Sequence, residues 1–268
     1  MSFDPSVGFK FRTNIIRLIM SYSKRFHRVI MDYEGNKRSD YDEVAVEDSI
    51  TLFVNDVRIA TLIASPDMLK ELCIGYLISE GVVSDFDEIQ KVRVDDVKME
   101  AYITVSSFDQ VELWHEVRSS GCIGIKWWTN EDIQVQSTAT FRKEVIQKSL
   151  LYLDTSARRQ THGVHTAALF DITGELLAQG VDVGRHSAVD KVIGTYAEND
   201  FSRTFLLSSG RQPAGMVLKA ARAGIPLVVS KAAPISTGIE AARHAGVTLV
   251  CFANEQQFAA YTHEERIS

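Results

Sequence analysis

The chain has 268 residues, enough for one large domain or two modest ones that bury a core without disulfides or metals. Apolar residues make up 45% of the chain and charged residues 24%, which argues against disordered and low-complexity classes. The 29 basic and 35 acidic residues give a formal net charge of −6, so we expect no nucleic-acid partner. The chain has no run of about 18 apolar residues, so we expect no membrane span.

Residues 1–40 predict a partly ordered N-terminal extension. Their short apolar run at 15–20 is interrupted by Arg17 and followed by Lys24 and Arg25, unlike the continuous apolar stretch of a secretory signal. The three cysteines of the chain are odd in number and far apart, which is a poor disulfide framework and suits a reducing compartment. We therefore expect a cytoplasmic protein.

Residues 41–150 predict a smaller α+β subdomain. The β-prone runs 51–54 and 57–63 flank the turn-favouring pair Asn55-Asp56 and predict a hairpin. Ser65-Pro66 predicts the N-cap and first turn of a helix that stops at Gly81. The other expected elements of this half are strands over 89–94 and 97–105, an irregular segment over 116–138 and a helix over 139–153.

Residues 151–268 predict an α/β domain. A hairpin with its turn at Thr173-Gly174 is followed by alternating strands and helices. Short, continuous apolar strands joined by helices predict a largely parallel sheet covered on both faces. The expected strands cover 205–207, 227–229 and 247–252, and the expected helices follow Gly184, surround Met216 and begin at a Thr237…Glu240 capping box.

The loops after these strands are the place to look for a ligand, because in open α/β sheets ligands bind at the carboxyl ends of the strands, near helix N-termini. Small residues there let a ligand reach backbone N–H groups, and arginine and lysine add positive charge. The pattern fits a phosphate or pyrophosphate site, and equally a set of turns that need small residues. The candidate residues are Asp182, Arg185, His186, Ser209, Gly210, Arg211, Lys231, Phe252, Ala253, Asn254, Glu255, Gln256 and Gln257.

The three cysteines differ in context. Cys73 lies on the apolar stripe of an expected helix and Cys251 in an apolar strand, so both are expected to be core residues. Cys122 lies between Gly121 and Gly124, with basic residues on either side, and such surroundings favour a reactive thiolate. A loop cysteine without a role is the alternative.

A metal site is not expected in the second half. It has no C-x-x-C pair, and His186-Ser187-Ala188 lacks the glutamate of the zinc deaminases. The order of elements nevertheless resembles the deaminase sheet, here without its metal. His165 is expected to be a structural histidine, and His186 a candidate for the ligand site.

Three stretches are distinctive. Cys73–Gly81 reads CIGYLISEG; GVHTAA at 163–168 continues to DVGRHSAVDK at 182–191; and SGR at 209–211 leads to KAARAGIP at 219–226. They are similar to GFLxSEG, GVHxAAL…EDVGRHNAxDK and SGR…KAARAGIP of the formate dehydrogenase accessory sulfurtransferase family, FdhD. Ser187 replaces that family's asparagine. The resemblance covers roughly residues 43–268.

The resemblance implies a fold and a function. It implies a cytidine-deaminase-like mixed sheet with helices on both faces, a smaller N-terminal α+β subdomain, and a homodimer. Family members accept sulfur from a cysteine desulfurase as a cysteine persulfide. They pass it to the molybdenum (or tungsten) bis-guanine-dinucleotide cofactor that formate dehydrogenase needs, so the cofactor is a bound acceptor. The persulfide maps onto Cys122, and a family cofactor-binding stretch before Tyr261-Thr262-His263 maps onto Phe252–Gln257.

This chain departs from the family pattern at two places. The family's G-C-G-x-C-G loop has a second cysteine where this chain has Ile125, so an intramolecular disulfide cannot resolve the persulfide. Gln256-Gln257 stands where the family often has glycine-arginine, which removes a bidentate phosphate partner. A non-catalytic carrier of the same cofactor is therefore the second hypothesis. A nucleobase deaminase, the third, lacks its zinc ligands.

Overall fold

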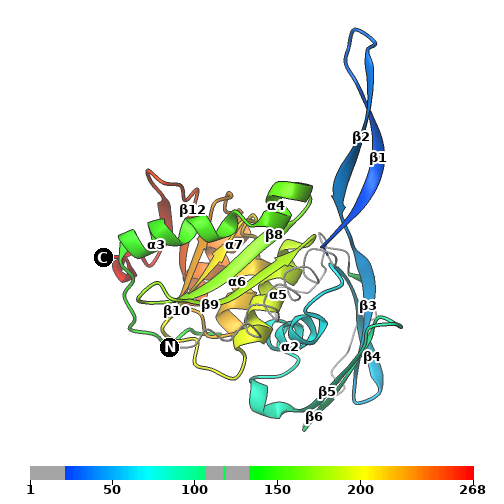
Figure 1. The fold of residues 1–268 in the computed structure, drawn as a ribbon. Coiled ribbons are helices and arrows are strands. Elements are labelled where there is room, and N and C mark those ends of the chain that lie inside the picture. The colour runs from blue at the N-terminus through cyan, green and yellow to red at the C-terminus, as the bar shows by residue number, and fades with distance from the viewer. Residues whose placement is uncertain (1–21, 107–116, 119–132) are drawn as a thin grey trace, which may run out of the picture.

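The computed structural model describes residues 22–106, 117–118 and 133–268 (Figure 1). Its larger sheet has the strand order β13-β12-β11-β10-β8-β9. The pairs β10–β11 and β11–β12 are parallel, whereas β8, β9 and β13 run antiparallel to their neighbours. The sheet is therefore mixed, and parallel only at its centre. Its strands are β8 (His165–Asp171), β9 (Leu176–Asp182), β10 (Thr204–Ser208), β11 (Leu227–Ser230), β12 (Thr248–Cys251) and β13 (Ala259–Thr262).

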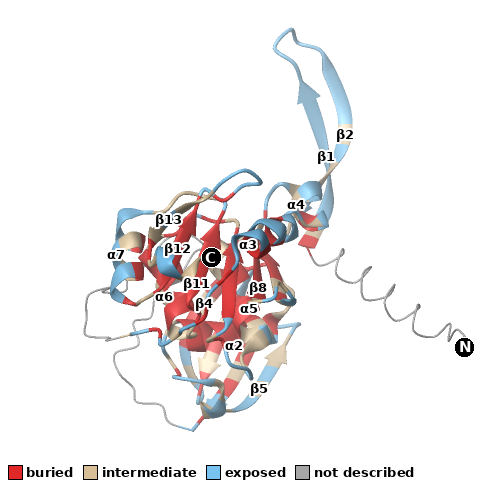
Figure 2. Ribbon diagram, turned by 90° about the vertical axis from the view of Figure 1, so that its left-hand side faces the viewer, coloured by how far each residue is buried: buried red, intermediate tan, exposed pale blue. Residues whose placement is uncertain are grey.

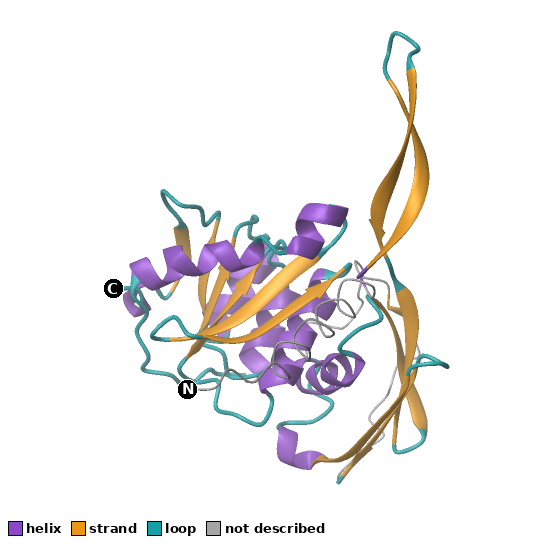
Figure 3. Cartoon of the chain, viewed as in Figure 1, coloured by secondary structure: helices purple, strands orange, loops and turns teal. Residues whose placement is uncertain are grey.

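Helices cover both faces of this sheet, as expected (Figure 3). The alternation of side chains along each strand divides the core in two. In β10, Leu206 packs into the core beside α5 (Arg185–Tyr196), α6 (Ala214–Arg222) and α7 (Ser236–His244). Phe205 and Leu207 pack on the opposite face, against α3 (Lys143–Ser149) and the 3₁₀ turn η2 (Leu150–Leu153). A strand that is buried on both faces has a continuous run of apolar residues, and this run is why the sequence pattern predicted β10.

A second sheet of five strands, in the order β5-β6-β3-β4-β7, forms the N-terminal subdomain with α2 (Leu69–Ser79). Asn55 and Asp56 both have positive φ, 45° and 65°, as a type I′ turn requires, so the predicted hairpin is confirmed. The strands are β3 (Asp48–Val54), β4 (Val57–Ala64), β5 (Ile89–Asp95), β6 (Glu100–Val105) and β7 (Val117–Arg118); the short helices are η1 (Phe86–Glu88) and, at the chain's end, η3 (Glu264–Arg266).

Two predicted helix caps are wrong. The helix α2 begins at Leu69, four residues after Ser65. The backbone N–H of Ser65 instead donates to the Asp182 carboxylate at 3.0 Å, and its carbonyl accepts from Lys191 Nζ at 3.1 Å. The helix α7 has Ile235 at its N-cap, with no side-chain capping bond, so Thr237 lies inside the helix.

Residues 23–45 form a hairpin that the sequence analysis did not predict. The strands β1 (Ser23–Met31) and β2 (Lys37–Ala45) pair antiparallel and extend away from both sheets; we call this hairpin the arm (Figures 1 and 2). It is exposed on both faces, and charged and apolar residues mix on each, so no burial pattern marks it. The guanidinium of Arg25 lies over the Tyr41 ring, 4.6 Å from its centroid. The expected boundary at residue 40 therefore falls inside β2.

The expected boundary at residue 150 also differs from the structure. It falls inside the helical stretch α3–η2, whose residues Val145, Ile146 and Leu150 pack in the core of the α/β domain. Phe141 stacks edge-on against Phe205, and its backbone N–H donates to the Arg266 carbonyl. The α/β domain therefore begins before α3, because apolar side chains of this linking helix cover one face of its sheet.

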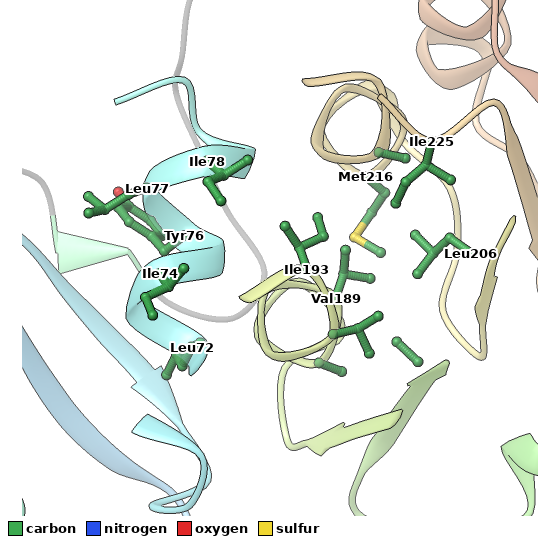
Figure 4. Close-up of a cluster of buried hydrophobic side chains, with 14 of the residues drawn as sticks. Leu72, Ile74, Tyr76, Leu77, Ile78, Val189, Ile193, Leu206, Met216 and Ile225 are labelled. Atoms are coloured by element: carbon green, nitrogen blue, oxygen red, sulfur yellow. The ribbon is translucent and has the colours of Figure 1, made fainter. Parts of the chain in front are cut away.

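The two units meet where α2 packs against α5. Figure 4 shows α2 beside α5, whose Val189 and Ile193 extend toward Met216 of α6. The two helix backbones are so close that a Cβ added to Gly75 would lie 1.8 Å from the Asp190 carbonyl oxygen. Glycine is therefore required at this crossing.

Two buried lysines connect the same two units. Lys191 Nζ lies 2.7 Å from the Asp182 carboxylate and 2.8 Å from that of Asp67. Lys219 Nζ lies 2.7 Å from Asp190 and 2.8 Å from Glu80. Each lysine of the α/β domain thus has one carboxylate partner in its own domain and one in the subdomain.

Candidate functional site

The strands β9, β10, β11 and β12 end at one edge of the six-stranded sheet, because β9 and β10 are both antiparallel to β8. Backbone hydrogen bonds join the loops that follow them: Lys231 N–H donates to the Ser208 carbonyl at 3.3 Å, and Ala253 N–H to the Ser230 carbonyl at 3.0 Å. The structure thereby places the loops that carry the candidate residues of the second half at one edge of the sheet. That they bind a cofactor stays a prediction.

Three helices start at this edge without a side-chain cap. The N-caps of α5, α6 and α7 are Gly184, Pro213 and Ile235, and none of them makes a side-chain capping bond. First-turn N–H groups that no side chain satisfies are donors for water or an anion, and the helix dipole adds partial positive charge. Arg211 and Lys231 are exposed beside them. The edge is thus electropositive on a protein of net charge −6.

The Ser209-Gly210-Arg211 loop is held from both sides. Ser209 Oγ accepts a hydrogen bond from Thr166 N–H at 3.0 Å, and the Gly210 carbonyl accepts from Ser230 Oγ at 2.7 Å. A Cβ added to Gly210 would lie 2.8 Å from the Cβ of Arg185, so only glycine leaves room for that side chain. The loop therefore packs closely against the Arg185 side chain, and Arg211 projects from the loop into solvent.

Asp182 and His186 have different surroundings. The Asp182 carboxylate is buried and accepts hydrogen bonds from Ser65 N–H and, at 2.8 Å, Gly184 N–H. Burial raises its pKa to about 6, against the opposite effect of the Lys191 ammonium. Asp182 thus orders the turn that starts α5. Arg185 and His186, both half-buried in the first turn of α5, are closer to where a ligand can reach.

The loop from Phe252 to Gln257 closes on itself. The Asn254 side-chain oxygen accepts hydrogen bonds from the backbone N–H groups of Gln256, at 2.9 Å, and Gln257, at 3.0 Å. Those two N–H groups are therefore occupied by the chain itself. Phe252 has a φ of 55°, and about half of the residue is exposed at the edge.

The predicted persulfide cysteine, Cys122, and its neighbour Ile125 lie outside the described residues. The described cysteines, Cys73 and Cys251, are both buried, which confirms that they are core residues. Burial raises the pKa of each thiol to about 12. Neither carries a significant thiolate population at neutral pH.

The sequence analysis missed α4 (Ser156–Thr161) and with it Arg158, which stands beside His162 and His165 at the start of β8. A local signal was present, because four of the eight residues from 158 to 165 are arginine or histidine. The His165 ring is tied to the predicted site through Nδ1, 3.2 Å from Ser209 Oγ.

Within the described ranges, no group of three or more histidine, cysteine, aspartate and glutamate side chains is arranged to hold a metal ion. None of the helices in those ranges has the length and apolar character needed to cross a membrane.

Comparison with known proteins shows which family the chain resembles. The model of the FdhD/NarQ family matches residues 45–268. The chain is 34% identical to the sulfur carrier protein FdhD of Bacillus pumilus, over 93% of this chain and 100% of that protein. It is 36% identical to the sulfur carrier protein FdhD of Sulfolobus acidocaldarius, over 87% of this chain and 94% of that protein.

A solved structure shares the fold. The crystal structure of a putative formate dehydrogenase accessory protein from Desulfotalea psychrophila superposes with a TM-score of 0.77 at 24% identity, over 92% of this chain and all of that one. The resemblance inferred from the three sequence stretches is thereby confirmed, as is the mixed α+β fold. The chain belongs to the FdhD/NarQ family.

Proposed function

We propose that this protein is a sulfurtransferase that receives sulfur as a persulfide on Cys122 and delivers it to the molybdenum or tungsten bis-guanine-dinucleotide cofactor for formate dehydrogenase. A cysteine desulfurase is the donor, and the protein works as a cytoplasmic homodimer. Membership in the FdhD/NarQ family, whose relatives carry the name sulfur carrier protein, supports sulfur transfer in general. The donor, the persulfide, the cofactor and the homodimer are our extension of it.

The assignment to Cys122 rests on elimination among three cysteines. Cys73 and Cys251 are buried thiols with pKa values raised to about 12, so they neither ionise readily nor meet a partner protein. Cys122 is the remaining thiol, between two glycines and near Arg118 and Lys126. This elimination is the observation that carries the proposal.

The chemistry needs one thiolate. The Cys122 thiolate attacks the outer sulfur of the donor persulfide, the donor's S–S bond breaks, and the donor cysteine leaves as a thiolate. Transfer to the cofactor restores the Cys122 thiolate, and the metal supplies the two electrons that reduce the sulfur. Because Ile125 replaces the second family cysteine, no neighbouring thiol can expel the sulfur as sulfide, and the persulfide is held until an acceptor arrives.

The decisive experiment measures the intact mass after incubation with a cysteine desulfurase and cysteine. The wild-type protein is expected to gain the mass of one sulfur atom, reversibly with reductant, and Cys122→Ala is expected to gain none. Cys73→Ala serves as the matched control and should load like wild type. Equal loading of wild type and Cys122→Ala, or none in either, would contradict the sulfurtransferase and favour the non-catalytic carrier of the same cofactor.

A second prediction concerns the cofactor's nucleotide half. Arg211→Ala is expected to weaken GDP binding, measured by calorimetry, about 10- to 100-fold. The substitution removes an exposed guanidinium and with it the charged hydrogen bonds that this group would donate to phosphate. Sulfur loading should stay intact. Arg243→Ala, an exposed arginine in the last turn of α7, is the control. Unchanged GDP affinity in Arg211→Ala would remove that residue from the site.

A further inference from the structure

A cavity of about 340 Å³ lies between the end of α4 and the start of β8. It is lined by Arg158, His162, Gly163, Val164 and His165. Small-molecule sites begin at roughly this size, about 300 Å³. The cavity is next to the candidate site, because His165 pairs with Asp182 across β8 and β9.

The ionisable side chains that line this cavity are all basic. Three of its five lining residues carry basic side chains, and none carries a carboxylate. The neighbouring Arg159 is neutralised by Asp154 at 2.9 Å, but within the described ranges the Arg158 guanidinium has neither a carboxylate nor a hydrogen-bond acceptor. Burial and the positive charges of Arg185 and Arg158 lower the pKa of His165. An arginine that has no partner among the described residues and lies in a partly enclosed space fits an anionic ligand.

The hydrogen bonds of His165 define which ring nitrogen faces a ligand. Ser209 Oγ already accepts from Thr166 N–H, so its own proton is free to be donated to His165 Nδ1, 3.2 Å away. In the neutral ring the proton then resides on Nε2. His165 can therefore donate from Nε2, and the same Ser209 joins the cavity to the Ser209-Gly210-Arg211 loop.

We propose that this cavity binds a phosphoryl group, held by Arg158 and by Nε2 of His165, and that it extends the candidate site across β8 to α4. Arg211 follows β10, and β10 is the neighbour of β8 in the sheet, one inter-strand spacing of about 5 Å away, so an extended nucleotide can occupy Arg211 and this cavity together. The assignment of the phosphoryl group to a guanine dinucleotide rests on the proposed function. Binding of an oxyanion by the cavity does not.

The test is a titration of the full-length protein with inorganic phosphate, pyrophosphate and GDP, observed through the NMR signal of the His165 ring. Assignment comes from the signal lost in His165→Gln. Bound phosphate is expected to shift that signal and raise the pKa of His165, because an anion stabilises the imidazolium. Arg158→Ala should weaken the response at least about tenfold, whereas its neighbour Arg159→Ala should behave as wild type.

The three ligands separate the possible sources of the phosphoryl group. If Arg158→Ala weakens both GDP and inorganic phosphate, the cavity is a nucleotide subsite; if it weakens only the inorganic ions, the cavity takes a free phosphate. A His165 signal that no ligand moves, or equal responses in Arg158→Ala and Arg159→Ala, overturns the inference. The dinucleotide site is judged separately, by the response of GDP affinity to Arg211→Ala.

Discussion

Replacing Lys219 with methionine is expected to lower the free energy of unfolding by about 3 to 5 kcal/mol, because it leaves buried carboxylates without their cation. Lys219 is buried, with Nζ 2.7 Å from Asp190 Oδ1, 2.8 Å from Glu80 Oε1 and 2.8 Å from Ser79 Oγ. Methionine fills a volume similar to that of lysine, so the decrease in the free energy of unfolding arises from the lost charge more than from altered packing. Urea denaturation at pH 7 measures it.

The pH dependence of the stability of Lys219→Met provides a second test of the same prediction. Burial raises the pKa of Asp190 above its usual 3.8, and the Lys219 ammonium opposes that effect. Without the ammonium, the folded state holds the Asp190 proton at a pH where the unfolded state has released it. The free energy of unfolding of the Lys219→Met variant should therefore rise as the pH falls from 7 toward 4. Lys70→Met, exposed on α2, is the control and should stay within about 0.5 kcal/mol of wild type. Matching urea midpoints for the two variants would contradict the prediction.

Gly75→Ala is expected to destabilise the protein by about 3 kcal/mol or more, at the upper end of overpacking effects. The added Cβ would lie 1.8 Å from the Asp190 carbonyl oxygen and 2.8 Å from Gly194 N, both backbone atoms that cannot swing aside. In an isolated helix the same change would stabilise by about 1 kcal/mol, so the two effects have opposite signs. Thermal unfolding of the purified variant decides between them.

Thr195→Ala provides the matched control for that variant. Thr195 follows Gly194 in α5 but is exposed, so alanine there should leave the melting temperature nearly unchanged. A Gly75→Ala variant that melts at or above the wild-type temperature would show that the two helices can separate without cost.

Local patterns predicted much of this fold. The hairpin around Asn55-Asp56 and the alternating strands and helices after residue 164 follow from turn residues and apolar runs within a few positions of each other. The cap at Ser65 failed because its hydroxyl oxygen, the group that would cap a helix, accepts a hydrogen bond from Val183 N–H, 118 residues away. The arm, α4 and β13 carry no periodic apolar pattern that would have marked them.

The candidate site was predicted in outline, because the carboxyl ends of parallel strands must meet at one edge. The roles within it were not. In the stretch from 182 to 191 the sequence does not distinguish residues that face a ligand from residues that bind the subdomain. The structure assigns Asp182, Asp190 and Lys191 to buried ion pairs and leaves Arg185 and His186 at the edge.

The shared lysine partners between the two units also limit how the family can change. A chimera that takes its N-terminal subdomain from a relative inherits Asp67 and Glu80 from one parent and Lys191 and Lys219 from the other. A change at either lysine leaves buried carboxylates without their cation, and a change at Asp67 or Glu80 leaves a buried lysine with one carboxylate partner in place of two. Such a chimera is therefore expected to be stable only where its two halves keep the same set of four residues.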